Sequence, residues 1–415
     1  MPSIQTFDDI ETAKTAIQHA LQSDGSAAQL NALSRIRLRL ADDVIFRLDP
    51  FSAAYRERAL AIYRQISGRS DYDPARDEKT DHYDASASRI PIPYRFRDSD
   101  LVGEFLACYG WILRALNVRD GASVLEYGSG EGQLILSLAR MGCKAYAVDI
   151  EQRFLDDIDR QASAIGVEVN TLNGQFGDSV PGILFDRVIF FEAFHHCLDH
   201  FETLSRIRQT LACDGFICLA GEPIIRAGSP NKLCVPYAWG PRLDGESLRS
   251  ISEFGWMELG YSEEYFIDLC MRAGFAVEFH PNPLFERGNV YIARPLRGCF
   301  PILSRALIST WEGKSGWHTA EATHRWTDGD AWLPLPRAIV RSARVTVVNF
   351  QPTTIEVIVS ADQEERRLLM TTGQRSTINI DLPEGASSLL IRSPSFTPPD
   401  DTRKLGVAVE AIEFS

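Results

Sequence analysis

The amino-acid sequence predicts an α/β fold built on a parallel sheet, with a helical region before it and a small all-β region after it. Three observations support this prediction. Short apolar runs alternate with helical periodicity between residues 122 and 295, as a parallel sheet with crossover helices requires. Residues 1–66 carry helical periodicity, whereas residues 337–415 hold alternating or β-branched runs separated by turns. A chain of 415 residues is also too long for one ordinary core.

The N-terminal region is expected to be helical throughout. Its periodicity predicts helices near 7–21, 27–40 and 51–66, and the polar stretch 67–90 is expected to be a hinge. We therefore expect a helical N-terminal region with linker at 1–90, an α/β domain at 91–296 with a lid insertion at 223–260, a connector at 297–336 and a β-sandwich at 337–415.

The α/β domain is expected to open with an amphipathic helix at 98–116. Strands and helices then alternate up to the last helix, and two closing strands read as a hairpin. The insertion is rich in Pro and Gly, which is typical of a functional segment at the carboxyl end of such a sheet. The expected strands are 123–127, 145–149, 168–172, 187–191, 216–220, 276–279 and 289–293, the expected helices 152–164, 201–211 and 263–273, and a connector helix lies near 304–312.

Composition excludes several classes of function. The 43 Lys and Arg against 56 Asp and Glu give a net charge of −13 without a basic run, so we expect no nucleic-acid partner. The eight cysteines form no C-x-x-C pair and read as buried apolar residues in a reducing compartment. No apolar run approaches the roughly 18 residues of a membrane span, so a soluble cytoplasmic protein is expected.

A glycine-rich turn follows the first predicted strand. Gly128, Gly130 and Gly132 stand at alternate positions between Val124-Leu125 and a helix that begins near Leu134. Glycine allows left-handed backbone angles and a close approach of the main chain to a ligand. The amides at the helix start would then face that ligand. This arrangement predicts a nucleotide-type binding loop.

The spacing of these glycines distinguishes between cofactors. It is G-x-G-x-G behind an acidic residue, whereas the dinucleotide fingerprint is G-x-G-x-x-G. The run 126–133, together with Val148-Asp149, resembles motif I and the following acidic position of class I S-adenosylmethionine-dependent methyltransferases. That family implies a Rossmann-like sheet of seven strands, the last antiparallel, and S-adenosylmethionine as cofactor. Asp149 would hold the ribose hydroxyls.

The same resemblance places the adenine at the turn after the third strand, 173–178. Relatives often carry an acid directly after the glycine, where this chain has Gln175, so the adenine contact falls to Gln175 or Asp178. The cofactor-binding residues that the resemblance implies are Glu126, Gly128, Ser129, Gly130, Gly132, Asp149, Ile150, Gln175 and Phe176.

Three of the eight histidines lie within residues 195–200, directly after the fourth predicted strand. In the family resembled, this edge of the sheet faces the methyl acceptor. A hydroxyl acceptor loses its proton as it attacks, and imidazole is a suitable base near neutral pH. We predict His195 or His196 as the base, with Glu192 or Glu222 orienting the imidazole or the acceptor. The alternative is that one histidine only packs or caps the next helix.

A metal is a second interpretation of this segment. His196 and His200 stand four residues apart, and Asp199, Glu192 and Glu222 offer oxygen ligands. The spacing is not a zinc signature, and Asp199 and His200 also suit the cap of the following helix. The prediction is therefore that no metal is required.

Longer stretches suggest the acceptor. Segments 191–197, 220–224, 236–245 and 255–261 resemble methyltransferases found with bacterial surface-polysaccharide synthesis, and 393–407 resembles a β-domain appended to enzymes of such systems. Aromatic side chains stack on sugar rings, and charged side chains such as carboxylates and guanidinium groups bind sugar hydroxyls. Each of these aromatic side chains would also suit packing in the core. The predicted substrate residues are Tyr237, Trp239, Arg242 and Asp244.

These observations predict an O-methyltransferase that uses S-adenosylmethionine on a sugar hydroxyl of a glycan or its precursor. A methyltransferase for a small metabolite or lipid is the first alternative. The second is a non-catalytic assembly subunit that docks through its β-domain. A homo-oligomer, or a partner in polysaccharide assembly, is compatible with all three.

Overall fold

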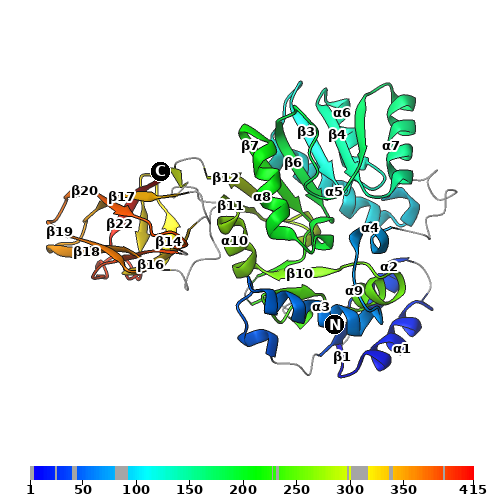
Figure 1. Ribbon diagram of the computed structural model, residues 1–415, viewed down its shortest axis with the longest axis horizontal. Helices are drawn as coiled ribbons and strands as arrows, with labels where there is room; N and C mark the ends of the chain where they lie inside the picture. Colours follow the sequence, from blue (N-terminus) through cyan, green and yellow to red (C-terminus); the bar gives the residue numbers. More distant parts are fainter. Residues whose placement is uncertain are drawn as a thin grey trace. The chain divides into compact units, whose positions relative to one another are not determined.

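The computed structural model describes residues 4–23, 26–39, 44–79, 92–226, 228–229, 233–296, 299–300, 316–335, 340–386 and 388–415. The chain divides into two compact units (Figure 1). The first comprises Met1–Phe266 with Pro281–Val290, and the second comprises Ile267–His280 with Tyr291–Ser415.

Five parallel strands form the sheet of the first unit, in the order β7-β6-β3-β4-β5. The cores of β3, β4, β6 and β7 are buried apolar runs, because helices cover both faces of a parallel sheet, whereas in β5, at the edge of this set, only Val169 is buried. In the register, Tyr127 lies opposite both Val148 and Phe190, so β3, β4 and β6 end level with one another. The strands are β3 (Ser123–Tyr127), β4 (Lys144–Asp149), β5 (Val169–Asn173), β6 (Phe185–Phe191) and β7 (Leu211–Ala220), all at their predicted places.

Capping residues mark the start of α5 and the end of α7. The Asp98 side chain accepts from the first amides of α5, and Gly166, with a φ of 72°, ends α7. The helices are α5 (Ser99–Leu116), α6 (Gln133–Arg140), α7 (Gln152–Ile165), α8 (His200–Thr210) and α10 (Glu263–Arg272), with short turns η3 (Tyr94–Phe96), η4 (Phe194–His196) and η7 (Glu286–Gly288).

The N-terminal region is not wholly helical, which corrects the prediction. The helix expected to reach residue 40 ends at Leu33, and residues 36–38 instead form a strand that pairs in parallel with residues 5–7. All three residues of that second strand are buried, and strand pairing satisfies their backbone groups. The elements are β1 (Gln5–Phe7), α1 (Ile10–Ala20), α2 (Ser26–Leu33), β2 (Ile36–Leu38), η1 (Val44–Arg47), α3 (Ala53–Ser67) and α4 (Pro74–Asp77).

The predicted hinge is also ordered over its first part. Asp77 is buried at 1% exposure and accepts from Arg69 and Arg76, a pairing that compensates its charge. Glu78 accepts from the Tyr72 hydroxyl at 2.7 Å and from the Met257 amide at 2.7 Å. Residues 67–79 are therefore packed structure, and the rest of the predicted hinge, 80–90, lies outside the described residues.

The insertion forms a wall packed against the N-terminal region. The Tyr55 hydroxyl donates to the Trp239 carbonyl at 2.9 Å, and the Leu38 amide donates to the Leu243 carbonyl at 2.8 Å. The insertion's helix α9 contacts α1 and α2, and Figure 1 shows it among these N-terminal helices. The insertion contains β8 (Ile224–Ile225), β9 (Trp239–Pro241), α9 (Gly245–Arg249), the π-helical turn η6 (Ser250–Phe254) and β10 (Leu259–Ser262), with sheet order β8-β10-β9.

The second unit contains two antiparallel sheets. Their orders are β14-β15-β22-β17-β20, with β13 beside β22, and β16-β21-β18-β19. The strands of 317–334 lie in the predicted connector but pair with later strands, so these sheets begin before residue 337; the helix expected at 304–312 lies outside the described residues. The strands of these two sheets are β13 (Cys299–Phe300), β14 (Trp317–Ala320), β15 (Arg325–Thr327), β16 (Asp330–Pro334), β17 (Ser342–Val348), β18 (Ile355–Ala361), β19 (Glu364–Met370), β20 (Arg375–Asp381), β21 (Ser388–Arg392) and β22 (Ala408–Phe414). Two further strands, β11 (Phe275–His280) and β12 (Val290–Pro295), belong to neither sheet.

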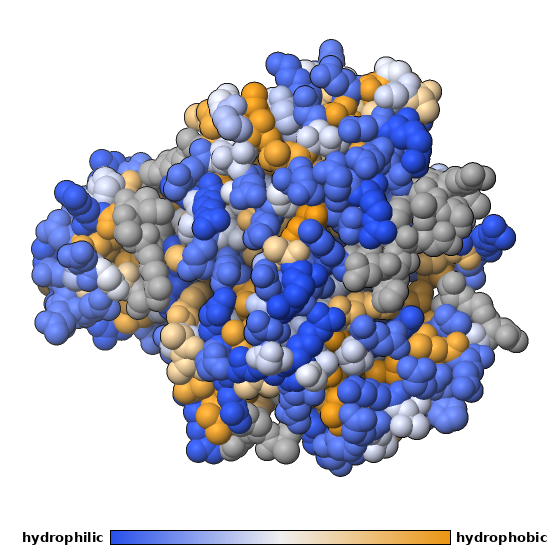
Figure 2. Space-filling model, turned by 45° about the vertical axis from the view of Figure 1, so that its right-hand side comes forward, coloured by the Kyte–Doolittle hydropathy of each residue, from blue (hydrophilic) through white to orange (hydrophobic). Residues whose placement is uncertain are grey.

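Hydrophilic residues cover most of the described surface seen in Figure 2, and hydrophobic residues occur on that face in small separate groups. Within the described parts of the chain, no helix combines the length and the apolar character that crossing a membrane requires.

Candidate active site

One cleft of about 1110 Å³ lies in the first unit. The glycine turn after β3 lines one part of it, and the loops after β6 and β7 line the centre. The insertion and α2 with β2 complete the wall through side chains that include Arg242, Trp256, Ser34 and Arg37. The N-terminal region, whose role the sequence left open, therefore forms part of the cleft.

The three glycines of the turn all have left-handed backbone angles, with φ of 63°, 50° and 77° at Gly128, Gly130 and Gly132. A Cβ at Gly128 would lie 2.7 Å from the Ala193 Cβ, and one at Gly132 would lie 2.5 Å from Ile158. A Cβ at Gly130 meets nothing within 4 Å. The outer glycines are thus packed against the protein, and the middle one faces open space where a ligand fits.

Two buried carboxyl groups flank this turn. Asp149, at the end of β4, accepts from the amides of Gly130 at 3.0 Å and Glu151 at 2.9 Å, and burial raises its pKa to about 6. Glu126 lines the cleft at 4% exposure, and burial raises its pKa to about 8. Its Oε2 atom has no hydrogen-bond partner among the described residues. An orphaned carboxyl beside an open glycine turn fits the amino-acid part of S-adenosylmethionine.

The predicted cofactor residues divide into two groups. Phe176 packs edge-on against Tyr127 and Phe190, below the turn, and Gln175 is exposed. Five of the nine line the cleft, namely Glu126, Gly128, Ser129, Gly130 and Gly132. The other four, Asp149, Ile150, Gln175 and Phe176, are not among the described residues that line it.

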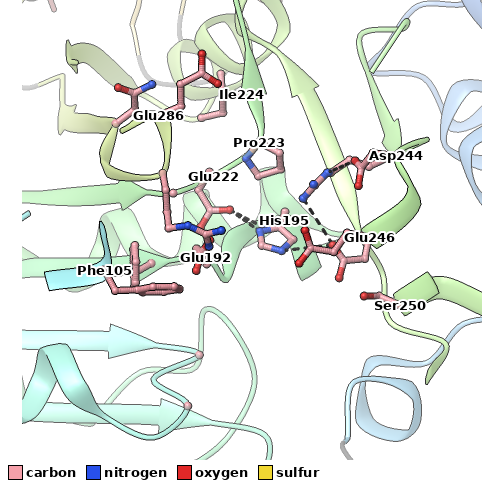
Figure 3. A pocket seen from close by; sticks show the side chains of 18 of the residues that line it. Phe105, Glu192, His195, Glu222, Pro223, Ile224, Asp244, Glu246, Ser250 and Glu286 are labelled. Atoms are coloured by element: carbon pink, nitrogen blue, oxygen red, sulfur yellow. Dashed lines mark hydrogen bonds and ion pairs between the residues drawn. The ribbon is translucent and has the colours of Figure 1, made fainter. Parts of the chain in front are cut away.

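His195 and Glu222 form a hydrogen-bonded pair at the centre of the cleft (Figure 3). His195 Nδ1 lies 2.9 Å from Glu222 Oε2, and the same carboxylate accepts from the amides of Ala193, Phe194 and His195 at 2.9–3.0 Å. Burial alone would raise the pKa of Glu222, but the hydrogen bonds from His195 and these amides bring it below its usual value. The ionised carboxylate fixes a proton on Nδ1 and leaves Nε2 as the free nitrogen.

Glu192, the other predicted orienting residue, pairs with a different group. Its side chain contacts the guanidinium of Arg287, which also lies 3.2 Å from Glu104 and over the ring of Phe105. Glu192 has a φ of 51°, a strained angle for a residue with a side chain. Glu222, rather than Glu192, therefore holds the imidazole.

His196 and His200 lie outside the described lining of the cleft. The Nδ1 atom of His196 is 3.1 Å from Glu78 Oε2; burial alone would lower its pKa, but Glu78 raises it to about 9. His200 is buried, with Nε2 2.6 Å from the Tyr265 hydroxyl, and burial lowers its pKa to about 4. The alternative metal site required His196, His200 and carboxylates such as Asp199 to point at one another. In the structure Asp199 instead pairs with Arg56 and His200 with Tyr265, so these ligands do not converge.

The predicted substrate residues also divide. Arg242 and Asp244 line the cleft and form an ion pair at 3.0 Å. Tyr237 and Trp239 are buried at 4% and 3% exposure, and the Trp239 indole donates to the Pro50 carbonyl at 2.9 Å. The structure therefore places these two rings in the packing of the insertion rather than in the cleft.

Sequence reasoning missed several residues that the fold brings to this site. Glu258 follows Trp256 in the insertion, Arg287 comes from η7, and Glu78 comes from the predicted hinge. Glu258 lies in the segment 255–261 that carries the family resemblance, but it was not singled out there, and Arg287 and Glu78 lie outside the segments that carry it. Their signal was weak, consisting of isolated charged residues in segments that were read as loops.

Comparisons with known proteins agree with the methyltransferase fold that the glycine turn predicts. A family model described as a methyltransferase domain matches residues 124–215. Ribosomal protein L11 methyltransferase of Thermus thermophilus is 29% identical over 117 residues, which are 27% of this chain and 45% of that relative. The chain thus spans less than half of this curated relative.

Solved structures include partial matches of low identity. A TehB-like SAM-dependent methyltransferase from Corynebacterium glutamicum is 15% identical, covers 51% of this chain and 98% of its own, and gives a TM-score of 0.35. Magnesium protoporphyrin IX methyltransferase from Synechocystis, solved with bound SAM, is 14% identical, covers 55% and 99%, and gives a TM-score of 0.37.

Proposed function

We infer that the chain is an S-adenosylmethionine-dependent methyltransferase of class I, with its methyltransferase domain over residues 124–215. We propose that it transfers the methyl group to a hydroxyl of a sugar in a glycan or glycan precursor, with His195 as the base. The observation that carries this proposal is that the glycine turn and the His195–Glu222 pair line the same cleft. When bound, S-adenosylmethionine supplies an electrophilic methyl group.

His195 has the geometry of a general base. Its Nδ1 is held by a buried carboxylate, so Nε2 is the nitrogen free to take a proton from an acceptor hydroxyl. The amides that hold Glu222 also fix the ring's own backbone, so the ring and its partner are positioned together. This arrangement supports proton transfer to one defined atom.

The chemistry of the acceptor side supports a polyol. The cleft exceeds the usual range of about 300–1,000 Å³ for a single small ligand, so a cofactor and an acceptor can share it. Charged groups such as Arg242, Asp244 and Glu246 can bind hydroxyls, and Trp256 offers an aromatic surface.

We further propose that β11 and β12 complete a seven-stranded sheet and that the C-terminal sheets form a sandwich.

The proposal is tested first by calorimetry with S-adenosylhomocysteine. We expect the intact protein to bind it, and Asp149→Ala and Gly130→Val to lose at least about tenfold in affinity, because one removes the carboxylate and the other fills the open space of the turn. His195→Ala should keep that affinity and lower turnover on saccharide acceptors by about 10²–10⁴. Absence of binding to the folded wild-type protein would overturn the proposal.

A further inference from the structure

The imidazole of His195, which lines the cleft, and that of its neighbour His196 lie close to a third side chain that the proposed function does not use. Ligand atoms of His195, His196 and Glu258 all lie within 4.8 Å of one another. The His195 Nε2 atom is 3.7 Å from Glu258 Oε2. Two ligands of one tetrahedral zinc ion, with bonds of about 2.1 Å, are separated by roughly 3.4 Å, so this spacing is close to what a shared ion requires.

Each imidazole also has a carboxylate behind it. Glu222 lies 2.9 Å from Nδ1 of His195, and Glu78 lies 3.1 Å from Nδ1 of His196. In both rings Nε2 is therefore the nitrogen left for a ligand. Histidines that bind metals commonly give their other ring N–H to a carboxylate, which orients the ring and makes it more basic.

The position of the two rings is fixed by backbone contacts. Both lie in the turn η4, whose amides donate to the buried carboxylate of Glu222, and their ring centroids are 4.3 Å apart. Glu78 is itself held by the Met257 amide, the residue directly before Glu258. The three ligand residues and both outer carboxylates thus form one connected cluster.

Charge around the cluster favours a cation. Three carboxylates, those of Glu78, Glu222 and Glu258, surround two imidazoles. Arg242 is the nearby guanidinium, but it lies 3.8 Å from Glu258 and closer, at 3.0 Å, to Asp244. A bound divalent ion would balance the negative charge that remains.

We propose that His195, His196 and Glu258 bind one divalent transition-metal ion of the Zn²⁺ class, with a coordination position open to the cleft. The binding itself stands on the geometry of the cluster, and only the ligand of the open position, an acceptor hydroxyl, rests on the proposed function. A hydroxyl on such an ion is acidic enough to lose its proton to solvent near neutral pH. With an ion bound, His195 would act as its ligand, and the role of His195 as the base in the proposed function would apply to the metal-free protein.

The test is a Co²⁺ titration of tag-free protein that has been treated with chelator and transferred to metal-free buffer. We expect one Co²⁺ per chain with the visible absorption of a low-coordinate ion, displaced by Zn²⁺. Glu258→Gln and His196→Gln should each weaken Co²⁺ binding by about tenfold or more. Glu246→Gln is the matched control, because Glu246 lines the same cleft outside the cluster and should leave Co²⁺ binding unchanged.

Circular dichroism of every variant separates loss of ligand from loss of fold. Folded wild-type protein that takes up no Co²⁺, or binding that both cluster variants retain in full, would overturn the metal site. S-adenosylhomocysteine affinity of the metal-free protein is measured in parallel. If that affinity persists without a metal site, only this inference fails; if Co²⁺ binds and the cofactor product does not, the proposed function fails instead.

Discussion

Glu126 lines the cleft, so a ligand bound there should change the ionisation of its carboxyl group. Its carboxyl is almost fully buried, has an oxygen without a partner in the described structure and has a pKa raised to about 8 by burial. The folded protein therefore holds this proton at pH 7, whereas an exposed Glu would have lost it. Stability contributed by the neutral carboxyl declines as the pH rises from about 4.5 to 8.

We predict that binding of S-adenosylmethionine releases a proton near pH 7. A cationic group placed beside Glu126 favours the carboxylate and lowers its pKa, so affinity should rise as the pH increases towards 8 and level off above it. The measurement is calorimetry of binding in buffers with different ionisation enthalpies, which gives the number of protons released.

Glu126→Gln is the control for that experiment, since it keeps the shape of the side chain and cannot ionise. We expect no proton release in this variant, and none attributable to Glu126 in the wild type at pH 9. Equal release by variant and wild type would show that another group titrates.

Some residues of the candidate site were predicted from the sequence, and others were not. The prediction named His195 or His196 with Glu192 or Glu222, because three histidines follow the fourth strand at the edge that faces the acceptor in the family resembled. The structure pairs His195 with Glu222. Glu78 and Glu258 were not predicted, because their contacts depend on how the N-terminal region and the insertion pack. Such packing has no local sequence signature.

At the scale of elements, the turn between β3 and α6 allows a paired prediction. Gly132→Ala places a Cβ 2.5 Å from Ile158 at a left-handed φ of 77°, whereas Gly130→Ala meets only open space at a φ of 50°. Backbone strain costs about 1–2 kcal/mol in either case, and overpacking adds about 1–3 kcal/mol in Gly132→Ala alone. Urea unfolding curves should show the larger loss of stability for Gly132→Ala, and equal losses would contradict this account.

Elements with strong periodicity were predicted well. The strands β3 to β7 and the helices α5, α7 and α8 lie where apolar runs and caps place them. The strand β2 was read as helix, because a buried three-residue strand carries no period of its own. The short elements of the insertion depend on tertiary contacts for the same reason.

At the scale of the whole molecule, the C-terminal sheets predict where the chain tolerates truncation. Deletion of residues 337–415 leaves β15 and β16 without the strands they pair with, β22 and β21. Exposed strand edges of this kind promote aggregation. Deletion of residues 299–415 removes every strand of both sheets, and all described residues lining the cleft lie before residue 290.

We therefore expect the longer deletion to give a monodisperse protein that still binds S-adenosylhomocysteine, and the shorter one to aggregate. Size-exclusion chromatography and calorimetry measure the two outcomes. Loss of cofactor binding by the monodisperse longer deletion would show that the C-terminal residues support the cleft.

The wall contributed by Ser34 and Arg37 has an evolutionary consequence. The donor end of the cavity is encoded by a short stretch around the glycine turn, whereas the opposite end is encoded by the N-terminal segment around residues 30–37 and by the insertion. Selection can thus vary these two segments jointly while the donor end stays untouched. A chimaera that swaps both segments together, rather than either alone, is the natural unit for redirecting such a protein to a new acceptor.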